Sequence, residues 1–299
     1  MSQSTPAGVY TCPWCQAVSD GSGRGCPNCG APIDVRVKET VSGWYEMPAI
    51  KDMTVIHFGH SRLQVEGLIV PVCDMNLAAG EWVYFPHHAL LWKDETIGIA
   101  KLQTKAGWNR SYRGHDWYLA TAQGPGHVSF SRDEPGEMVA VPLQAGMAVD
   151  VREHVLVVAH GAVSYDWFNP GVWFTTKNGD DTEYHYPLGQ WMDRFSAPQQ
   201  PGLVMLHAGG NAFIRMLAAG EVILIKPSAL LFKDASVGMQ LHFEHPAGTW
   251  RSWRSWGNRY SWLRVWGPGR IAVQSCYEMF EDPGRDLVGF SSATRRQWQ

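Results

Sequence analysis

Long hydrophobic runs are missing from this 299-residue sequence. No apolar stretch approaches the roughly 20 residues that a transmembrane helix needs. The opening segment, Met1 to Gly8, has neither the basic start nor the apolar centre of a secretion signal. We therefore expect the protein to stay in the cytoplasm, where it is made, with peripheral membrane association as an open alternative.

A strong net charge is also absent, because the formal charge at pH 7 is only −3. Nothing overall calls for a polyanionic partner, so nucleic acid is not the favoured partner. Cysteine is scarce as well: four of the six form two Cys-x-x-Cys pairs, while Cys73 and Cys276 lie far apart. This usage excludes a dense disulfide framework and favours a reducing compartment with a metal site.

The sequence lacks the common catalytic motifs. It has no Gly-x-Ser-x-Gly element, no phosphate-binding loop and no dinucleotide fingerprint. Adjacent His87 and His88 would point to opposite faces of an extended chain and could not readily chelate one ion. We interpret Cys73 and Cys276 as small buried hydrophobic residues. The sequence therefore predicts that the protein is not an enzyme; a cupin-like metalloenzyme with an additional ion remains an alternative.

The two Cys-x-x-Cys pairs, Cys12 with Cys15 and Cys26 with Cys29, lie ten residues apart near the start of the chain. Each pair lets one tight turn present two thiolates to the same ion, and two such turns complete a tetrahedron. The segment is too small for a hydrophobic core, and zinc can supply about 10 kcal/mol or more of folding free energy. We predict one structural Zn²⁺ in a ribbon over residues 1–36, followed by a linker over 37–51. Because sulfur fills all four positions, this zinc should not be catalytic.

An internal repeat dominates the rest of the chain. Two strong copies share a Leu-Ala-Ala-Gly-Glu turn and a later Ala-Leu-Leu strand, at 77–81 with 89–91 and at 217–221 with 229–231. A diverged copy lies between them, with a Gln-Ala-Gly turn at 144–146 and an apolar run at 155–159. A Pro-Gly turn and an apolar strand follow each copy, at 124–128, 201–204 and 267–271. Such self-similarity indicates repeated structural units, so Gly80, Gly146 and Gly220 should occupy equivalent turns about a pseudo-threefold axis.

Each copy has the pattern of short β-strands, with alternating or fully apolar runs separated by Gly, Pro and Asn. Expected strands include 82–85, 149–158, 222–225 and 261–266, whereas no segment keeps an apolar helical period over three turns. We expect an all-β domain over 52–291, in which three repeats of about 52–142, 143–210 and 211–291 close around a shared core. Residues 292–299 form a tail.

These motifs resemble the mitochondrial biogenesis (altered inheritance of mitochondria) family. The resemblance rests on the Gly-Glu turns at 80–81 and 220–221, on the Ala-Leu-Leu strands and on the closing segment 263–274. It implies a double-stranded β-helix like that of the tryptophan RNA-binding attenuation protein, a tendency to form homo-oligomers, and no established reaction. The family's usual Phe-Gly-Gly-Glu-Gly loop is replaced here by segments that contain Tyr112, Arg113 and Arg259.

Aromatic and basic residues alternate between Thr249 and Trp266. Such a segment can pack against a core or a neighbouring subunit, can contact a glycan or a membrane surface, or can stack on nucleic-acid bases. We favour packing or a homo-oligomer interface, with a ring-shaped trimer as the expected assembly, and we keep a binding module as the alternative. The candidate interaction residues are Trp250, Trp253, Trp256, Arg251, Arg254, Arg259, Tyr112 and Arg113.

The sequence thus predicts a non-enzymatic, oligomeric β-scaffold whose zinc ribbon contacts a protein partner.

Overall fold

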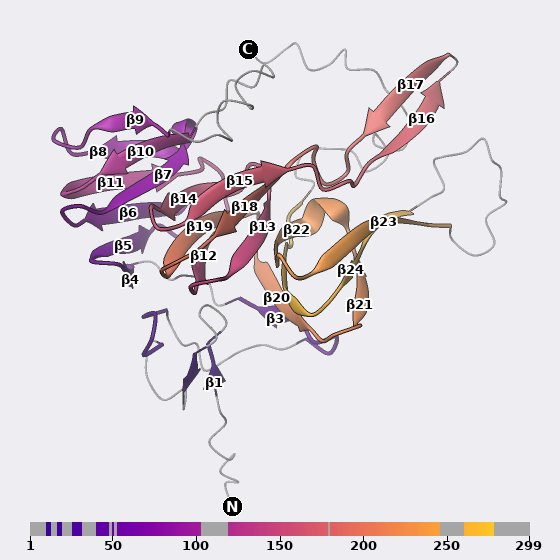
Figure 1. Cartoon of the computed structure of the whole chain (residues 1–299), viewed down its shortest axis with the longest axis horizontal. Helices are drawn as coiled ribbons and strands as arrows, with labels where there is room; N and C mark the ends of the chain where they lie inside the picture. The colour runs from indigo at the N-terminus through magenta and orange to yellow at the C-terminus, as the bar shows by residue number, and fades with distance from the viewer. Residues whose placement is uncertain are drawn as a thin grey trace, which may run out of the picture.

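The computed structural model describes residues 10–12, 17–19, 26–31, 40–47, 50, 53–102, 119–178, 180–245 and 260–277. Within these residues the chain forms antiparallel β-strands and two short 3₁₀ turns, and it contains no α-helix, so the all-β prediction is confirmed (Figure 1). No described helix is long and apolar enough to cross a membrane.

Most strands belong to three consecutive units of six strands each. The first unit (residues 72–131) contains β6 (Val72–Leu77), β7 (Trp82–Pro86), β8 (Leu90–Lys93), β9 (Ile99–Lys101), β10 (Leu119–Gln123) and β11 (Gly126–Ser131). The second unit (137–208) contains β12 (Glu137–Leu143), β13 (Ala148–Arg152), β14 (Leu156–His160), β15 (Ser164–Phe168), β18 (Met192–Ser196) and β19 (Gly202–Ala208). The third unit (212–274) contains β20 (Ala212–Leu217), β21 (Val222–Ile225), β22 (Leu230–Asp234), β23 (Gly238–Glu244), β24 (Tyr260–Trp266) and β25 (Gly269–Gln274).

The remaining elements precede or interrupt these units. The 3₁₀ turns η1 (His87–Ala89) and η2 (Pro227–Ala229) lie before β8 and β22. The hairpin β4–β5 extends the first unit, β3 pairs with β20, and the hairpin β16–β17 lies between β15 and β18. Their bounds are β1 (Tyr10–Thr11), β2 (Val18–Ser19), β3 (Tyr45–Glu46), β4 (Thr54–Phe58), β5 (Ser61–Glu66), β16 (Phe174–Asn178) and β17 (Asp181–His185).

Strand pairing follows one scheme in all three units. The sixth strand pairs with the first and the third, and the fifth strand pairs with the second and the fourth. Each Pro-Gly turn leads into the sixth strand, as expected. The scheme agrees with the sequence repeat, while the pseudo-threefold axis stays a prediction.

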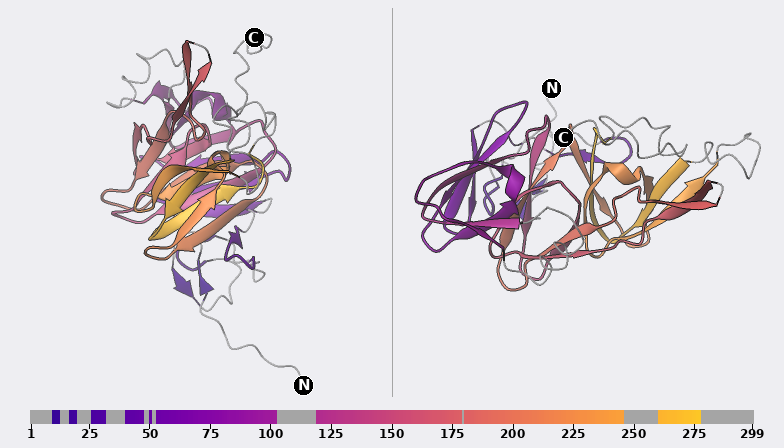
Figure 2. Two further views of the ribbon diagram at one scale, coloured as in Figure 1. Left: turned by 90° about the vertical axis from the view of Figure 1, so that its right-hand side faces the viewer. Right: turned by 90° about the horizontal axis from the view of Figure 1, so that it is seen from above.

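Neighbouring units are joined by shared sheets. Strand β14 of the second unit pairs with β7 of the first, and β22 of the third unit pairs with β13 of the second. We call these contacts the first and the second junction. The first and third units lie at opposite ends of the molecule's long axis (Figures 1 and 2).

A glycine with positive φ follows the first strand of each unit. Gly80, Gly146 and Gly220 have φ values of +84°, +86° and +80°. A backbone bond of the same type closes each turn, for example from the Glu81 amide to the Ala78 carbonyl and from the Glu221 amide to the Ala218 carbonyl, both at 3.1 Å. Glycine adopts such φ values at little cost, which explains why the sequence repeat is strongest at these turns.

The buried side chains form two clusters, and the larger one contains residues of all three units. The larger cluster spans the first two units and reaches Leu231, Phe232 and Ala272 of the third, whereas the smaller one combines other residues of the third unit with Val172, Leu188 and Met192. One expected strand, 149–158, is also divided in two, because the chain turns at Glu153 and His154 between β13 and β14.

Candidate metal centre

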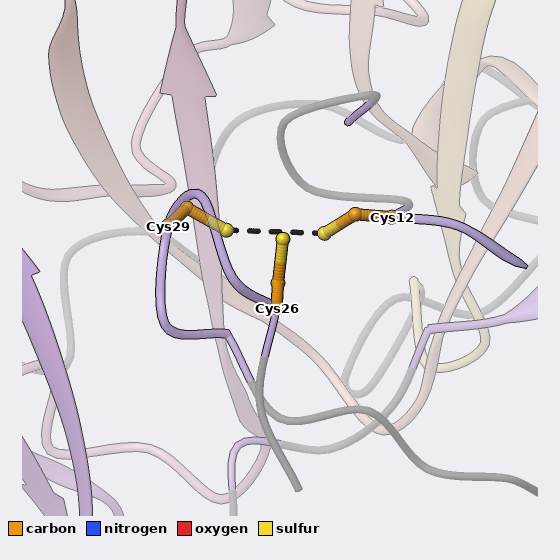
Figure 3. A group of neighbouring side chains, drawn as sticks. All are labelled: Cys12, Cys26 and Cys29. Carbon is orange, nitrogen blue, oxygen red and sulfur yellow. Dashed lines mark hydrogen bonds between the residues drawn. The ribbon is translucent and has the colours of Figure 1, made fainter. Parts of the chain in front are cut away.

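Three cysteine thiols converge near the start of the chain. The sulfur atoms of Cys12, Cys26 and Cys29 all lie within 4.8 Å of one another, and those of Cys12 and Cys29 are 3.8 Å apart (Figure 3). Cys12 and Cys26 are buried, and Cys29 is partly buried. No other group of three or more His, Cys, Asp or Glu side chains with metal-ligand geometry occurs among the described residues.

The spacing of these thiols fits a tetrahedral metal ion. Bonds of about 2.3 Å from zinc to sulfur place the sulfur atoms of a regular tetrahedron about 3.8 Å apart. The pair Cys12 and Cys29 has this separation. The cluster could therefore hold a metal ion. Cys15, the predicted fourth ligand, lies outside the described residues.

Both cysteine turns are closed in the same way. The Cys12 amide donates a hydrogen bond to the Ala17 carbonyl at 2.9 Å, and the Cys26 amide donates one to the Ala31 carbonyl at 2.7 Å. In each turn the acceptor lies five residues after the first cysteine. The recurring Cys-x-x-Cys-x-Ala spacing in the sequence was a signal for this closure that the cysteine pairs alone did not reveal.

The cysteine cluster packs against the β-domain. Cys12, Cys26 and Ala31 belong to the same buried cluster as the first two units. A cavity of about 240 Å³ lies between them, lined on one side by Asn28, Cys29 and Ala31 and on the other by β4, β12 and the start of β19. The sequence did not predict this docking, because it depends on contacts between segments that are far apart in the chain.

The two adjacent histidines differ from the sequence expectation. His87 and His88 lie in the 3₁₀ turn η1, not in an extended strand, and their rings meet edge to face with centroids 5.5 Å apart. Arg132 Nη1 donates a hydrogen bond to His88 Nε2 at 2.6 Å. Burial, then the charge of Arg132, lowers the pKa of His88 to about 4. Burial and the contact with Arg132 thus keep His88 neutral near pH 7.

Three of the single histidines have structural partners. His160 Nε2 lies 2.7 Å from Glu81 Oε2, His185 Nε2 lies 2.7 Å from Thr176 Oγ1, and His207 Nε2 donates to the Glu134 carbonyl at 3.0 Å. Each side chain is therefore positioned by hydrogen bonding.

The two remaining thiols differ from each other. Cys73 is fully buried in β6, as predicted, and burial, followed by the charge of Asp74, raises its pKa strongly. Cys276 is only partly buried, contrary to the prediction. It lines a second cavity of about 400 Å³ together with basic and acidic side chains such as Arg132, Glu134 and Glu153. Since charges of both signs line this cavity, it favours no particular class of ligand.

The other predicted site residues cannot be placed. Tyr112, Arg113, Trp250, Arg251, Trp253, Arg254, Trp256 and Arg259 all lie outside the described residues. Their assignment to an interface or a binding surface stays a prediction.

The fold and the site define an all-β protein of three serial six-strand units that carries a cysteine cluster suited to a metal ion. The profile of the mitochondrial biogenesis AIM24 family matches residues 63–276, and the chain belongs to this family. No curated protein is significantly similar to the chain. A solved structure of a protein from Streptococcus pyogenes aligns with 73% of this chain and 95% of its own, at 14% identity and a TM-score of 0.48.

Proposed function

We propose that this protein is a non-enzymatic scaffold that self-associates through its β-domain and carries a structural zinc ion. The observation that carries this proposal is the exposure of large apolar side chains on strands at two sheet edges. Leu91 and Trp92 are exposed on β8, and Val222 and Leu224 are exposed on β21. An edge strand leaves backbone groups unpaired and can template pairing with another strand. Apolar side chains at such an edge strengthen the case for an interface.

The zinc ribbon is the second part of the proposal. Cys15 completes the set formed by Cys12, Cys26 and Cys29, and the four thiolates hold one Zn²⁺ without an open position. The metal fixes the two turns, and the Cys29 side of the ribbon rests on the β-domain. Its other surfaces then serve as the contact for a protein partner. The double-stranded β-helix arrangement belongs to the same proposal, since the three units share one pairing scheme.

Two measurements on the purified full-length chain test the proposal. Light scattering at micromolar concentration should give a mass of two or more chains, and elemental analysis should give one zinc per chain. A strictly monomeric protein would refute self-association. An additional bound metal ion would favour the cupin-like enzyme instead of the scaffold.

The cell biology is a separate part of the proposal. We propose a cytoplasmic location, which the pairing of cysteines suited to a metal supports. The family description names mitochondrial biogenesis. Fractionation of the native cell, with the chain followed by antibody, tests the location, and recovery mainly with an organelle would overturn it.

A further inference from the structure

We infer that β8 of one copy pairs with β21 of a second copy, so that the protein assembles head to tail through the same strand contact that joins its own units. This inference rests on the proposed self-association and specifies its surface and register. The partner is a second copy of this chain.

The two internal junctions share one register. In the first junction His160 pairs with Val83 and Ala159 with Tyr84. In the second junction Asp234 pairs with Val149 and Lys233 with Asp150. Asp234 and Val149 hold the same places in the repeat as His160 and Val83, so the third strand of one unit meets the second strand of the unit before it in the same way.

A backbone hydrogen bond outside the strands repeats as well. The Gly161 amide donates to the Trp82 carbonyl at 2.8 Å in the first junction, and the Ala235 amide donates to the Ala148 carbonyl at 3.0 Å in the second. Gly161 and Ala235 each directly follow the third strand. The junction is therefore a reproducible contact of this fold and not an accident of one pair of strands.

The first and last units each have one strand without its junction partner. In the first unit this is the third strand, β8, which ends its sheet, and in the third unit it is the second strand, β21, which also ends its sheet. Other strands of the described part of the chain also lie at sheet edges, but their equivalents in the repeat do not form a junction. Among the described strands, only β8 and β21 are complementary by the rule that the two internal junctions obey.

Burial distinguishes the free edges from the internal junctions. Leu91 and Trp92 of β8 are 51% and 46% exposed, and Leu224 of β21 is 42% exposed. Their equivalents inside the molecule are at most 1% exposed, namely Val157, Val158, Leu231 and Phe232 on the third strands and Tyr84 and Asp150 on the second strands. Positions that the internal junctions help to bury are thus apolar and open to solvent at the two ends. A contact between copies would cover them again.

The shared register predicts the contacts between copies. Transferring it to β8 and β21 places Lys93 opposite Leu224 and Trp92 opposite Ile225 of the next copy. Arg264 already pairs with Leu224 inside the third unit, as Arg194 pairs with Asp150 inside the second. The position of Leu224 in the assembly is therefore equivalent to that of Asp150, between an arginine of its own unit and a lysine of the next.

The arrangement of the units excludes pairing within one chain. The first unit and the third unit lie at opposite ends of the long axis, so β8 cannot reach β21 of the same copy (Figures 1 and 2). The contact uses two different surfaces and is therefore heterologous. Such contacts continue into a ring when the rotation between copies closes and into a filament when it does not.

The test uses one full-length variant for each edge. Leu224→Lys places a second ammonium group opposite Lys93 and blocks β21, while Trp92→Lys blocks β8. Each variant alone should be monomeric at micromolar concentration by light scattering, with at least a 100-fold weaker association than the wild type. A one-to-one mixture should form a heterodimer and nothing larger, because one intact β8 and one intact β21 remain.

Two further variants control for surface charge and for register. Met216→Lys adds the same charge at an exposed position of β20, which lies within its sheet, and should leave the assembly unchanged. Lys93→Asp in the Leu224→Lys background should restore association, since an opposite-charge pair then replaces the like-charge pair. Circular dichroism should show that all variants retain the β-fold.

The outcomes separate this inference from the proposed function. A monomeric wild type would overturn both. An oligomeric wild type that neither Leu224→Lys nor Trp92→Lys weakens would overturn the edge pairing alone and leave self-association through another surface. Two monomeric variants that fail to form a heterodimer when mixed would also overturn the edge pairing.

Discussion

Replacing Asp150 should destabilise the protein strongly, because this carboxylate neutralises a buried lysine at the second junction. Lys233 Nζ lies 2.7 Å from Asp150 Oδ2, and both side chains are at most 5% exposed. Arg194 donates two further hydrogen bonds to Asp150, at 2.6 and 3.0 Å, which raise the pKa of Arg194. In Asp150→Ala the ammonium group of Lys233 stays buried without its counter-charge.

The expected loss of stability depends on which charged group loses its partner. Removing one partner of a buried ion pair costs about 3–5 kcal/mol. Arg194 is 42% exposed and can turn to water, so we assign most of that cost to Lys233. In Lys233→Met the carboxylate keeps both hydrogen bonds from Arg194, and we expect a loss of about 1–3 kcal/mol. Adding Lys233→Met to Asp150→Ala should therefore recover part of the stability.

The assay is urea unfolding followed by tryptophan fluorescence, with the three variants compared as a double-mutant cycle. The expected order of stability is wild type, Lys233→Met, the double variant and then Asp150→Ala. If Lys233→Met were the least stable of the set, or if Asp150→Ala matched the wild type, the reasoning about the uncompensated lysine would be refuted.

Four further predictions concern other parts of the molecule. Cys26→Ser should lose the zinc in elemental analysis while circular dichroism of the β-domain stays unchanged. Cys73→Ser, outside the cysteine cluster, is the control and should keep the zinc. Full zinc in a chain that starts at residue 45 would refute the ribbon. Gly161→Ala should cost about 1–3 kcal/mol in urea unfolding, because its Cβ would overlap the Trp82 ring, whereas Gly98→Ala, with open space, should cost much less. Burial alone would raise the pKa of Glu81, but hydrogen bonds from His160 and the His60 amide outweigh it and lower the pKa. A lowered folded-state pKa contributes stability that is present above the unfolded pKa of Glu and lost as the pH falls through the folded value. In Glu81→Gln the free energy of unfolding should therefore fall less steeply at low pH than in the wild type. An unchanged fall would contradict this. Trp253→Ser/Trp256→Ser should weaken association in light scattering if that segment also lies at an interface. An unaffected oligomer would leave the segment available for binding nucleic acid, a glycan or a membrane. A salt-dependent shift with single-stranded RNA would reveal nucleic-acid binding.

Local sequence patterns predicted the β-strands and turns well. The glycines at 80, 146 and 220 require a positive φ, and this requirement acts within a few residues, so the repeat could be recognised without a structure. The apolar run before His160 likewise predicted a strand, and all five residues of β14 are buried. The turn at Glu153 and His154 was missed, because no glycine or proline marks it.

The candidate metal site was likewise predicted only in part from the sequence. Paired cysteines indicate a metal because two thiolates on one tight turn can reach the same ion, and three of the four sulfur atoms do converge. The docking of the cluster against β4 and β12 had no local signal, since it depends on distant surfaces that match in shape.

The sequence by itself determined the all-β class, the repeated turns and the cysteine pairs, because each of these depends on residues close together in the chain. Only the tertiary structure decided how the units join. Sequence repetition suggested three units but not their connection, which the strand pairing makes through two junctions in series that leave β8 and β21 as edge strands. The physical reason is that backbone groups pair the same way whatever side chains they carry. Which strands can meet is therefore set by the arrangement of whole units in space, while the side chains of an edge strand decide whether such a contact is stable.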